Sequence, residues 1–175
     1  MELKDSETLK NLATAYLRES GAFNEYAFYA MQAKNEGLEK VYNTFNNFAH
    51  NEQAHAKVLF KLWHGIGDTK QNLSDAADLE NYERTVMYAE FSKIAKKEGF
   101  KEIAKTFDLI AKVEGTHEEE YRTLLDQLKN KTMFKSNEQV GWKCLNCGNI
   151  QYGKTPPETC PLCSHPKAYF MKIEN

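Results

Sequence analysis

The sequence has few residues that interrupt helices, no long apolar run and little charge imbalance. Four of its 175 residues are proline and nine are glycine, which favours long helices. No stretch reaches the roughly 18–20 consecutive apolar residues of a membrane-spanning helix. The net charge of −2 offers no basic field for nucleic acid or an anionic membrane surface. The composition therefore predicts a helical protein that binds neither nucleic acid nor membrane.

The amino-terminal residues and the cysteines together indicate a cytoplasmic protein. No basic segment followed by an apolar one opens the chain, so no secretory signal is predicted. The cysteines form two Cys-x-x-Cys pairs separated by twelve residues: Cys144 and Cys147, then Cys160 and Cys163. In a reducing cytosol such pairs predict a tetrahedral sulfur site for a metal before they predict disulfides. The spacing leaves the metal open, because zinc would be structural and iron would carry one electron.

Apolar residues recur at helical spacing along the first 130 residues. The predicted helices span residues 5–35, 38–63, 75–97 and 100–130. Asp5 or Ser6 is a suitable amino-terminal cap for the first helix, and Ser74 or Asp75 for the third. Short connections favour an antiparallel four-helix bundle, with room for a longer connection between the second and third helices.

The helical region repeats itself at an offset of 62 residues. The matching pairs include Tyr26 and Tyr88, Gly37 and Gly99, Phe45 and Phe107, Glu52 and Glu114, and His55 and His117. Shared apolar periodicity explains the aromatic matches, but it does not require the same glycine, glutamate and histidine. The repeat therefore predicts two similar helix pairs, each carrying one Glu-x-x-His motif.

The Glu-x-x-His motifs predict a site for two metal ions. Positions i and i+3 share one helix face, so each motif can direct a carboxylate oxygen and an imidazole nitrogen at one point. Glu19, Glu80 and Glu83 lie on the other two helices near the expected level of the motifs. Five carboxylates together carry about −5, and two divalent ions would reduce this to about −1. Carboxylate and imidazole ligands without thiolate favour iron or manganese, with zinc as an alternative.

Two tyrosines, Tyr26 and Tyr88, lie about two helical turns from the expected ligands. They either donate hydrogen bonds to ligand carboxylates or serve as ordinary core aromatics. The sequence leaves both interpretations open.

The character of the chain changes after Leu128. Residues 131–140 are polar and lack an apolar stripe, which predicts a linker. Residues 141–175 are too few to bury a sufficient core without a metal or another cross-link. Three parts are therefore predicted: a bundle over 1–130, the linker, and a small metal-binding domain over 141–175.

These motifs resemble those of rubrerythrins over essentially the whole chain. That family joins a ferritin-like di-iron four-helix bundle to a rubredoxin-like Fe(Cys)4 domain, so the resemblance implies a mainly α fold of this kind. The family's order of Glu, Glu-x-x-His, Glu-x-x-Glu and Glu-x-x-His is filled throughout. The implied di-iron ligands are Glu19, Glu52, His55, Glu80, Glu83, Glu114 and His117, and the implied ligands of a mononuclear iron are Cys144, Cys147, Cys160 and Cys163. Ser164 departs from free-standing rubredoxins, which usually have glycine there.

The resemblance implies a non-haem peroxidase that protects against oxidative stress. Glu83, the additional carboxylate, would exchange with His55 on one iron between the reduced and oxidised states. Hydrogen peroxide would be reduced to water, and electrons would return through the Fe(Cys)4 centre from a rubredoxin or an NAD(P)H-dependent reductase. The chain has no Gly-x-Gly-x-x-Gly fingerprint for binding the nicotinamide itself. A homodimer is also implied, and the alternatives are ferritin-like iron oxidation and storage or a zinc-bound structural protein.

Overall fold

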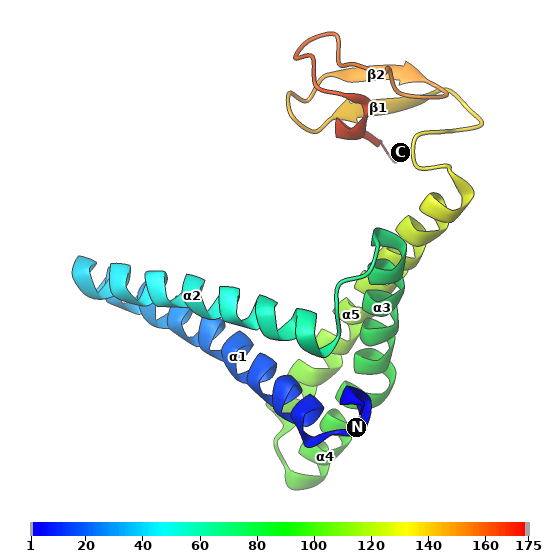
Figure 1. Ribbon diagram of the computed structural model, residues 1–175. Coiled ribbons are helices and arrows are strands. Elements are labelled where there is room, and N and C mark those ends of the chain that lie inside the picture. The colour runs from blue at the N-terminus through cyan, green and yellow to red at the C-terminus, as the bar shows by residue number, and fades with distance from the viewer. Residues whose placement is uncertain (1, 174–175) are drawn as a thin grey trace. The chain divides into compact units, whose positions relative to one another are not determined.

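The computed structural model describes residues 2–173 as long helices followed by a small antiparallel sheet (Figure 1). The chain divides into an amino-terminal unit, Met1–Gly67, and a carboxyl-terminal unit, Asp68–Asn175. Residues 1, 174 and 175, which the expected ranges 1–130 and 141–175 include, lie outside the described residues. Among the described residues, no helix combines the length and apolar character needed to cross a membrane.

The amino-terminal unit is a helical hairpin. A short 3-10 turn, η1 (Leu3–Asp5), precedes α1 (Glu7–Asn35), and α2 (Glu39–Trp63) lies alongside α1 (Figure 1). The predicted cap at Ser6 is confirmed, because its hydroxyl accepts a hydrogen bond from the backbone N–H of Leu9 at 3.3 Å. The buried residues of both helices are alanines, whose small side chains allow the backbones to approach closely.

The carboxyl-terminal unit begins with α3 (Thr69–Tyr82), a π-helical turn η2 (Glu83–Met87) and α4 (Tyr88–Glu98). These three elements form one continuous helical segment that packs against α5 (Lys101–Asn130) (Figure 1). Ser92, a buried polar residue of α4, donates a hydrogen bond to the carbonyl oxygen of Ala104 on α5 at 3.3 Å. This unit therefore also contains a helical hairpin.

The predicted start of the third helix at residue 75 is wrong. The helix begins six residues earlier, because the Asp68 carboxylate accepts a hydrogen bond from the backbone N–H of Gln71 at 2.9 Å. Residues 69–74 contain neither glycine nor proline, so nothing delays the helix to the cap predicted at Ser74 or Asp75. The connection between α2 and α3 is consequently only residues 64–68, and the longer connection considered from the sequence is absent.

The predicted repeat is visible in the local geometry of both hairpins. Gly37 and Gly99 have φ angles of 75° and 90°, a left-handed conformation that glycine adopts without steric cost. The next residues, Leu38 and Phe100, share φ near −90° and ψ of 65° and 66°. The matching aromatic contacts are Tyr26 with Phe45, at 6.1 Å between ring centroids, and Tyr88 with Phe107, at 5.9 Å. The same turn thus joins the two helices of each pair.

Three short strands form the end of the chain. They are β1 (Val140–Cys144), β2 (Ile150–Gly153) and β3 (Phe170–Lys172), in the antiparallel order β2-β1-β3, with a 3-10 turn η3 (Lys167–Tyr169) before β3. The core of this region consists of Trp142, Phe170 and two of the cysteines. The indole N–H of Trp142 donates a hydrogen bond to the carbonyl oxygen of Gly153 at 3.0 Å. The apolar core is small, and cysteines make up half of it.

Candidate metal centres

The four cysteines converge to form a cage of sulfur atoms. The Sγ atoms of Cys144 and Cys163 are 3.7 Å apart, and those of Cys147 and Cys160 are 3.6 Å apart. These distances exclude disulfide bonds, whose sulfur atoms are about 2.05 Å apart. A tetrahedron with metal–sulfur bonds of about 2.3 Å has edges of about 3.8 Å. The sulfur positions therefore fit a mononuclear tetrahedral metal site.

Each Cys-x-x-Cys pair is followed by a residue in the left-handed conformation. Gly148 has a φ of 76° and Ser164 a φ of 59°. The backbone N–H of Gly148 donates to the carbonyl oxygen of Cys144 at 2.8 Å, and that of Ser164 donates to Cys160 at 2.9 Å. The two turns are therefore equivalent, and Ser164 accepts a conformation that glycine would adopt more easily.

A backbone hydrogen bond favours the thiolate form of one cysteine in the sulfur cage. The backbone N–H of His165 stabilises the thiolate of Cys163 and lowers the pKa of this cysteine to about 6. Because metals bind the thiolate form, a cysteine that is already ionised near neutral pH favours metal binding.

The amino-terminal unit brings together Glu19 of α1 with Glu52 and His55 of α2. The Nδ1 atom of His55 lies 3.0 Å from Oε2 of Glu52 and 3.4 Å from Oε2 of Glu19. A hydrogen bond between the two carboxyl groups raises the pKa of Glu19 and lowers that of Glu52. The hydrogen bond that His55 donates to the Glu52 carboxylate also raises the pKa of His55. Without a cation, these groups therefore share protons among themselves.

The carboxyl-terminal unit contains a matching group, formed by Glu80 of α3 with Glu114 and His117 of α5. The Nδ1 atom of His117 lies 2.8 Å from Oε2 of Glu114 and 3.7 Å from Oε1 of Glu80. Burial, and then the charge of Glu114, raise the pKa of Glu80. Both units thus present two carboxylates and one imidazole in the same arrangement, which suits a hard or borderline cation such as iron.

Glu83 lies beside the second group rather than within it. The three convergent residues of that group are Glu80, Glu114 and His117. Burial, and then the charge of Glu114, nevertheless raise the pKa of Glu83. Glu83 is also the first residue of the π-helical turn, a type of helix distortion that is frequent at functional sites. The helix is therefore irregular where the additional carboxylate is presented.

The two tyrosines differ in their surroundings. Burial raises the pKa of Tyr88, and the nearby charges of Glu83, Glu114 and Glu80 raise it further. The hydroxyl of Tyr88 therefore lies in the electrostatic field of the ligand group. Tyr26 packs against Phe45 in the amino-terminal unit. Of the two tyrosines, Tyr88 is therefore the better candidate for an interaction with the ligand carboxylates.

An ion-pair network next to the second group was not anticipated from the sequence. Arg84 and Arg122 both bind the carboxylate of Glu118, at 2.9 and 2.8 Å, and Arg122 also reaches Asp78 at 3.2 Å. A Cβ atom on Gly115 would lie 3.0 Å from Cδ of Arg84, so this glycine leaves room for the arginine side chain. The available signal was the glycine inside the second Glu-x-x-His motif, where the first motif has glutamine. The network joins the π-helical turn to α5.

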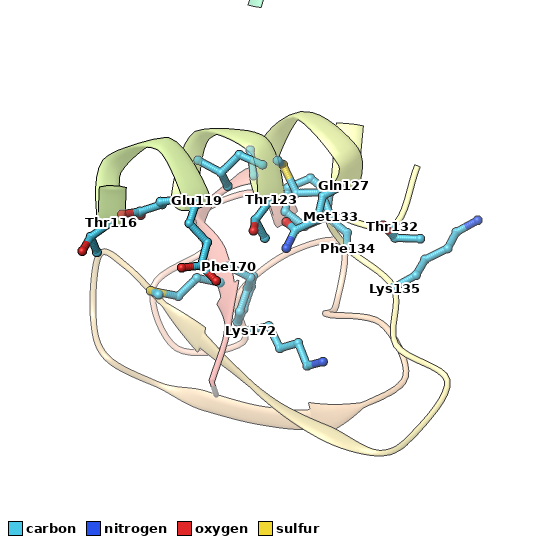
Figure 2. A pocket seen from close by; sticks show the side chains of 14 residues that line it. Thr116, Glu119, Thr123, Gln127, Thr132, Met133, Phe134, Lys135, Phe170 and Lys172 are labelled. Atoms are coloured by element: carbon cyan, nitrogen blue, oxygen red, sulfur yellow. The ribbon is translucent and has the colours of Figure 1, made fainter. Parts of the chain in front are cut away.

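A cavity of about 870 Å³ lies elsewhere in the carboxyl-terminal unit (Figure 2). Its lining comes from α5, residues 132–135, η3 and β3, and includes Glu119, Thr123 and Phe170. None of the expected metal ligands lines it, so we assign no metal chemistry to this cavity.

Comparison with known proteins identifies the family. A rubrerythrin family model matches residues 10–125, and a model of the rubrerythrin rubredoxin-like domain matches residues 142–171. The chain belongs to the rubrerythrin family. It is 44% identical to rubrerythrin-1 of Clostridium acetobutylicum, with 96% of this chain and 95% of the relative covered. It is 41% identical to a rubrerythrin of Porphyromonas gingivalis (98% and 92% covered) and 39% identical to one of Nitratidesulfovibrio vulgaris (96% and 95% covered).

Family membership confirms the predicted fold class, a mainly α, ferritin-like bundle with a small rubredoxin-like domain. It also confirms the predicted cofactors. The Glu/His groups of the two units correspond to the rubrerythrin di-iron site, and the four cysteines correspond to the rubredoxin-like site for one iron. The donor atoms fit these metals, because carboxylate and imidazole are found at one site and four thiols at the other.

We expect the metal-free Cys163→Ser variant, which lacks the thiol whose lowered pKa would raise stability over the same window, to be more stable at about pH 5.5 than at about pH 7.5. The pKa values of Glu80 and Glu83 are raised above their ordinary value of 4.5, so the unfolded state loses these protons first as pH rises. The raised pKa of His55 acts in the same direction, because its stabilising protonated form is lost at higher pH. The free energy of unfolding should therefore fall across this window.

Iron loading should abolish this decrease, because the cations replace the protons. Thermal unfolding followed by circular dichroism, with and without iron, measures both effects. The lowered pKa of Glu118 does not interfere, because its stabilising contribution is lost only below pH 4.5. A metal-free variant whose melting temperature rises between these two pH values would contradict the expectation.

Proposed function

We propose that the protein reduces hydrogen peroxide to water at a dinuclear iron site. The proposed ligands are Glu19, Glu52, His55, Glu80, Glu83, Glu114 and His117. The observation that carries the proposal is the pair of matching Glu, Glu and His groups, with Glu83 as an additional carboxylate beside one of them. A generic di-iron bundle needs four carboxylates and two histidines. The seventh residue therefore favours peroxide reduction over other di-iron chemistry.

The side chains contribute charge, orientation and protons. When bound, the iron pair would supply the two electrons that convert one peroxide and two protons into two waters. The carboxylates offset the charge of the cations, and His55 and His117 are oriented by Glu52 and Glu114 at 3.0 and 2.8 Å. Burial raises the pKa of Glu83, which makes its carboxyl group better able to hold and release a proton. Exchange of Glu83 and His55 as ligands is part of the proposal.

The four cysteines are proposed to hold the iron that returns electrons to the bundle. The corresponding parts are a bundle over residues 1–130, a linker over 131–140 and an electron-transfer domain over 141–175. A rubredoxin or an NAD(P)H-dependent reductase would supply the electrons, since the chain has no dinucleotide fingerprint. We place the reaction in the cytoplasm, where thiols stay reduced, and in a homodimer that protects against oxidative stress.

Iron oxidation and storage is the rival function, but a storage protein has no evident use for the sulfur cage. A zinc-bound structural role would leave the irregular π-helical turn at Glu83 without a purpose.

The proposed reduction of peroxide is tested by a single turnover in the absence of oxygen. The iron-loaded full chain is reduced and then mixed with one equivalent of peroxide. We expect oxidation of the iron pair within seconds and no release of iron. A pair that stays reduced in peroxide would rule out the proposed reaction.

A further inference from the structure

The α3–η2–α4 segment contains one residue more than α1 between equivalent positions. Glu19 and Tyr26 are seven residues apart in α1. Their counterparts, Glu80 and Tyr88, are eight residues apart. The backbone N–H of Tyr88 donates to the carbonyl oxygen of Glu83, five residues earlier, which is the hydrogen bond of a π-helix. The π-helical turn η2 therefore takes up the additional residue.

Both ends of this segment face α5. Oε1 of Glu80 lies 3.7 Å from Nδ1 of His117. The ring of Tyr88 lies 5.9 Å from that of Phe107, centroid to centroid. Each residue of a regular α-helix turns the chain by about 100°, so an additional residue would rotate one end away from α5. A π-helical turn avoids this rotation, but it is a rare form that needs contacts to hold it.

Arg84, the second residue of the turn, binds to α3 and to α5. Its Nη2 atom donates to Oε2 of Glu118 on α5 at 2.9 Å and to Oδ1 of Asn81 on α3 at 3.3 Å. The hydroxyl of Thr85 also donates to the carbonyl oxygen of Asn81, at 2.6 Å. The Glu118 side chain is only 12% exposed, so water screens its bond with Arg84 less than it screens a surface ion pair. The start of the turn is therefore tied to both neighbouring helices.

A second arginine fixes the carboxylate that Arg84 binds. The Nε atom of Arg122 donates to Oε1 of Glu118 at 2.8 Å, so each carboxylate oxygen of Glu118 has its own guanidinium partner. Nη2 of Arg122 also donates to Oδ1 of Asp78 on α3 at 3.2 Å. We call these four residues, Asp78, Arg84, Glu118 and Arg122, the arginine clamp. The clamp connects α3, which precedes the turn, with the turn itself through α5.

The first hairpin has apolar residues where α5 contributes to the arginine clamp. At the offset of 62 residues, Glu118 corresponds to Ala56 of α2, which is 7% exposed. Arg122 corresponds to Phe60, whose ring lies 5.2 Å from that of Tyr16 on α1. Apolar packing thus suffices for the hairpin in which α1 is a regular helix, and the charged contacts occur in the hairpin that contains the π-helical turn.

Gly115 makes room for the arginine clamp. It lies inside the second Glu-x-x-His motif, where the first motif has Gln53. Glycine weakens a helix interior relative to alanine, yet a Cβ atom here would lie only 3.0 Å from Cδ of Arg84. The helix that carries Glu114 and His117 therefore accommodates the arginine side chain at a position where a larger residue would displace it.

We infer that Arg84 is a positioning residue for Glu83. The arginine clamp holds the π-helical turn in place, and the turn presents the Glu83 carboxylate. A guanidinium has no acceptor atom and cannot bind a metal, so Arg84 acts through the backbone of the turn. The inference rests on the proposed role of Glu83 as an additional ligand, and it adds that a clamp outside the ligand set determines where that carboxylate lies.

Substitution of Arg84 tests this role in the iron-loaded full chain. Arg84→Met keeps an aliphatic stem beside Gly115 and removes the guanidinium, so we expect peroxide turnover to fall by about 10-fold at unchanged iron content. A single atom, Nη2, makes both contacts of Arg84, so Arg84→Lys, which keeps a cation near Glu118, should recover most of the lost rate. Steady-state reduction of peroxide with a reductase and NADH measures both variants.

The decisive comparison places the same substitution in a protein that lacks Glu83. If Arg84 acts only through Glu83, the double variant Glu83→Ala/Arg84→Met should be no slower than Glu83→Ala alone. A clamp that merely stabilised the hairpin would slow both backgrounds by the same factor. An equal effect in both backgrounds would therefore overturn the inference and leave the proposed function intact.

Lys96→Met is the matched control, because it breaks a different ion pair in the same unit. Nζ of Lys96 lies 2.9 Å from Oδ2 of Asp108 and joins α4 to α5 beyond the turn. Its loss should leave peroxide turnover at the wild-type rate. A fall in turnover equal to that of Arg84→Met would show that any ion pair between these helices matters, and would overturn the specific role of the clamp.

Hydrogen exchange of the metal-free full chain provides a readout that does not depend on iron. Peptides that cover the π-helical turn should exchange about 10-fold faster in Arg84→Met than in the wild type, and Lys96→Met should leave them unchanged. Unchanged exchange at the turn in Arg84→Met would overturn the inference. A wild-type protein that does not reduce peroxide would instead overturn the proposed function, and faster exchange confined to the turn would still support the clamp.

Discussion

Replacing Cys160 with serine is expected to stop the return of electrons to the bundle while sparing the first reaction with peroxide. The Cys160 side chain is 1% exposed, and its sulfur is one of the four atoms of the cage. A serine hydroxyl is a poor substitute for a thiolate ligand, and the core around Trp142 depends on the metal for its stability. We expect iron to be lost from this domain and the rate of rereduction to fall by about 100-fold or more.

Stopped-flow spectroscopy separates the two steps. Oxidation of the iron pair by peroxide is measured first, and rereduction by a reductase and NADH second. Ser164→Gly is the matched control, because it changes the residue after Cys163 without removing a ligand. Its φ of 59° suits glycine, so this variant should keep its iron and its rate. Normal rereduction in the Cys160→Ser variant would show that electrons do not pass through the sulfur cage.

Glu83→Ala should slow peroxide turnover by about 10- to 100-fold and leave the helices folded. Glu83 is not one of the three convergent residues of its unit, so its loss leaves Glu80, Glu114 and His117 in place. What it removes is the additional carboxylate that is proposed to exchange with His55. Steady-state peroxide reduction and helix content by circular dichroism are measured together.

Glu90→Ala is the control for loss of an acidic residue from the same helical segment. Its carboxylate is 56% exposed and pairs with Lys93 one turn away, a surface contact of little energetic weight. This variant should react at the wild-type rate. If Glu83→Ala also reacts at the wild-type rate, the seventh residue is not needed and the ligand-exchange proposal fails.

Periodicity was sufficient to predict the helices because most of the bundle follows a regular apolar pattern. The turns at Gly37 and Gly99 show the repeat directly, because glycine occupies the same left-handed position in both. The start of α3 was misplaced because two residues suited to cap a helix lie six residues apart. Asp68 is the cap in the structure, and Ser74 was the one predicted. Capping propensity alone does not distinguish them.

The site was predicted most securely where spacing alone fixes geometry. A Glu-x-x-His motif on a helix and two Cys-x-x-Cys pairs each place their donor atoms within a single turn or knuckle. Features that depend on packing between elements were not accessible from the sequence. The π-helical turn at Glu83 and the fit of Arg84 over Gly115 require the α3–η2–α4 segment and α5 to be placed together first.

Mössbauer spectroscopy of the iron-57-loaded protein tests the central claim most directly, since it counts the irons and identifies their surroundings at once. The account predicts three irons per chain. After peroxide treatment, two thirds of the signal should come from a spin-coupled ferric pair with oxygen and nitrogen ligands, and one third from a tetrahedral sulfur site. The coupled signal should vanish in the Glu114→Ala/His117→Ala variant and the sulfur signal should persist. A fully loaded wild-type protein with no spin-coupled pair would contradict the dinuclear site.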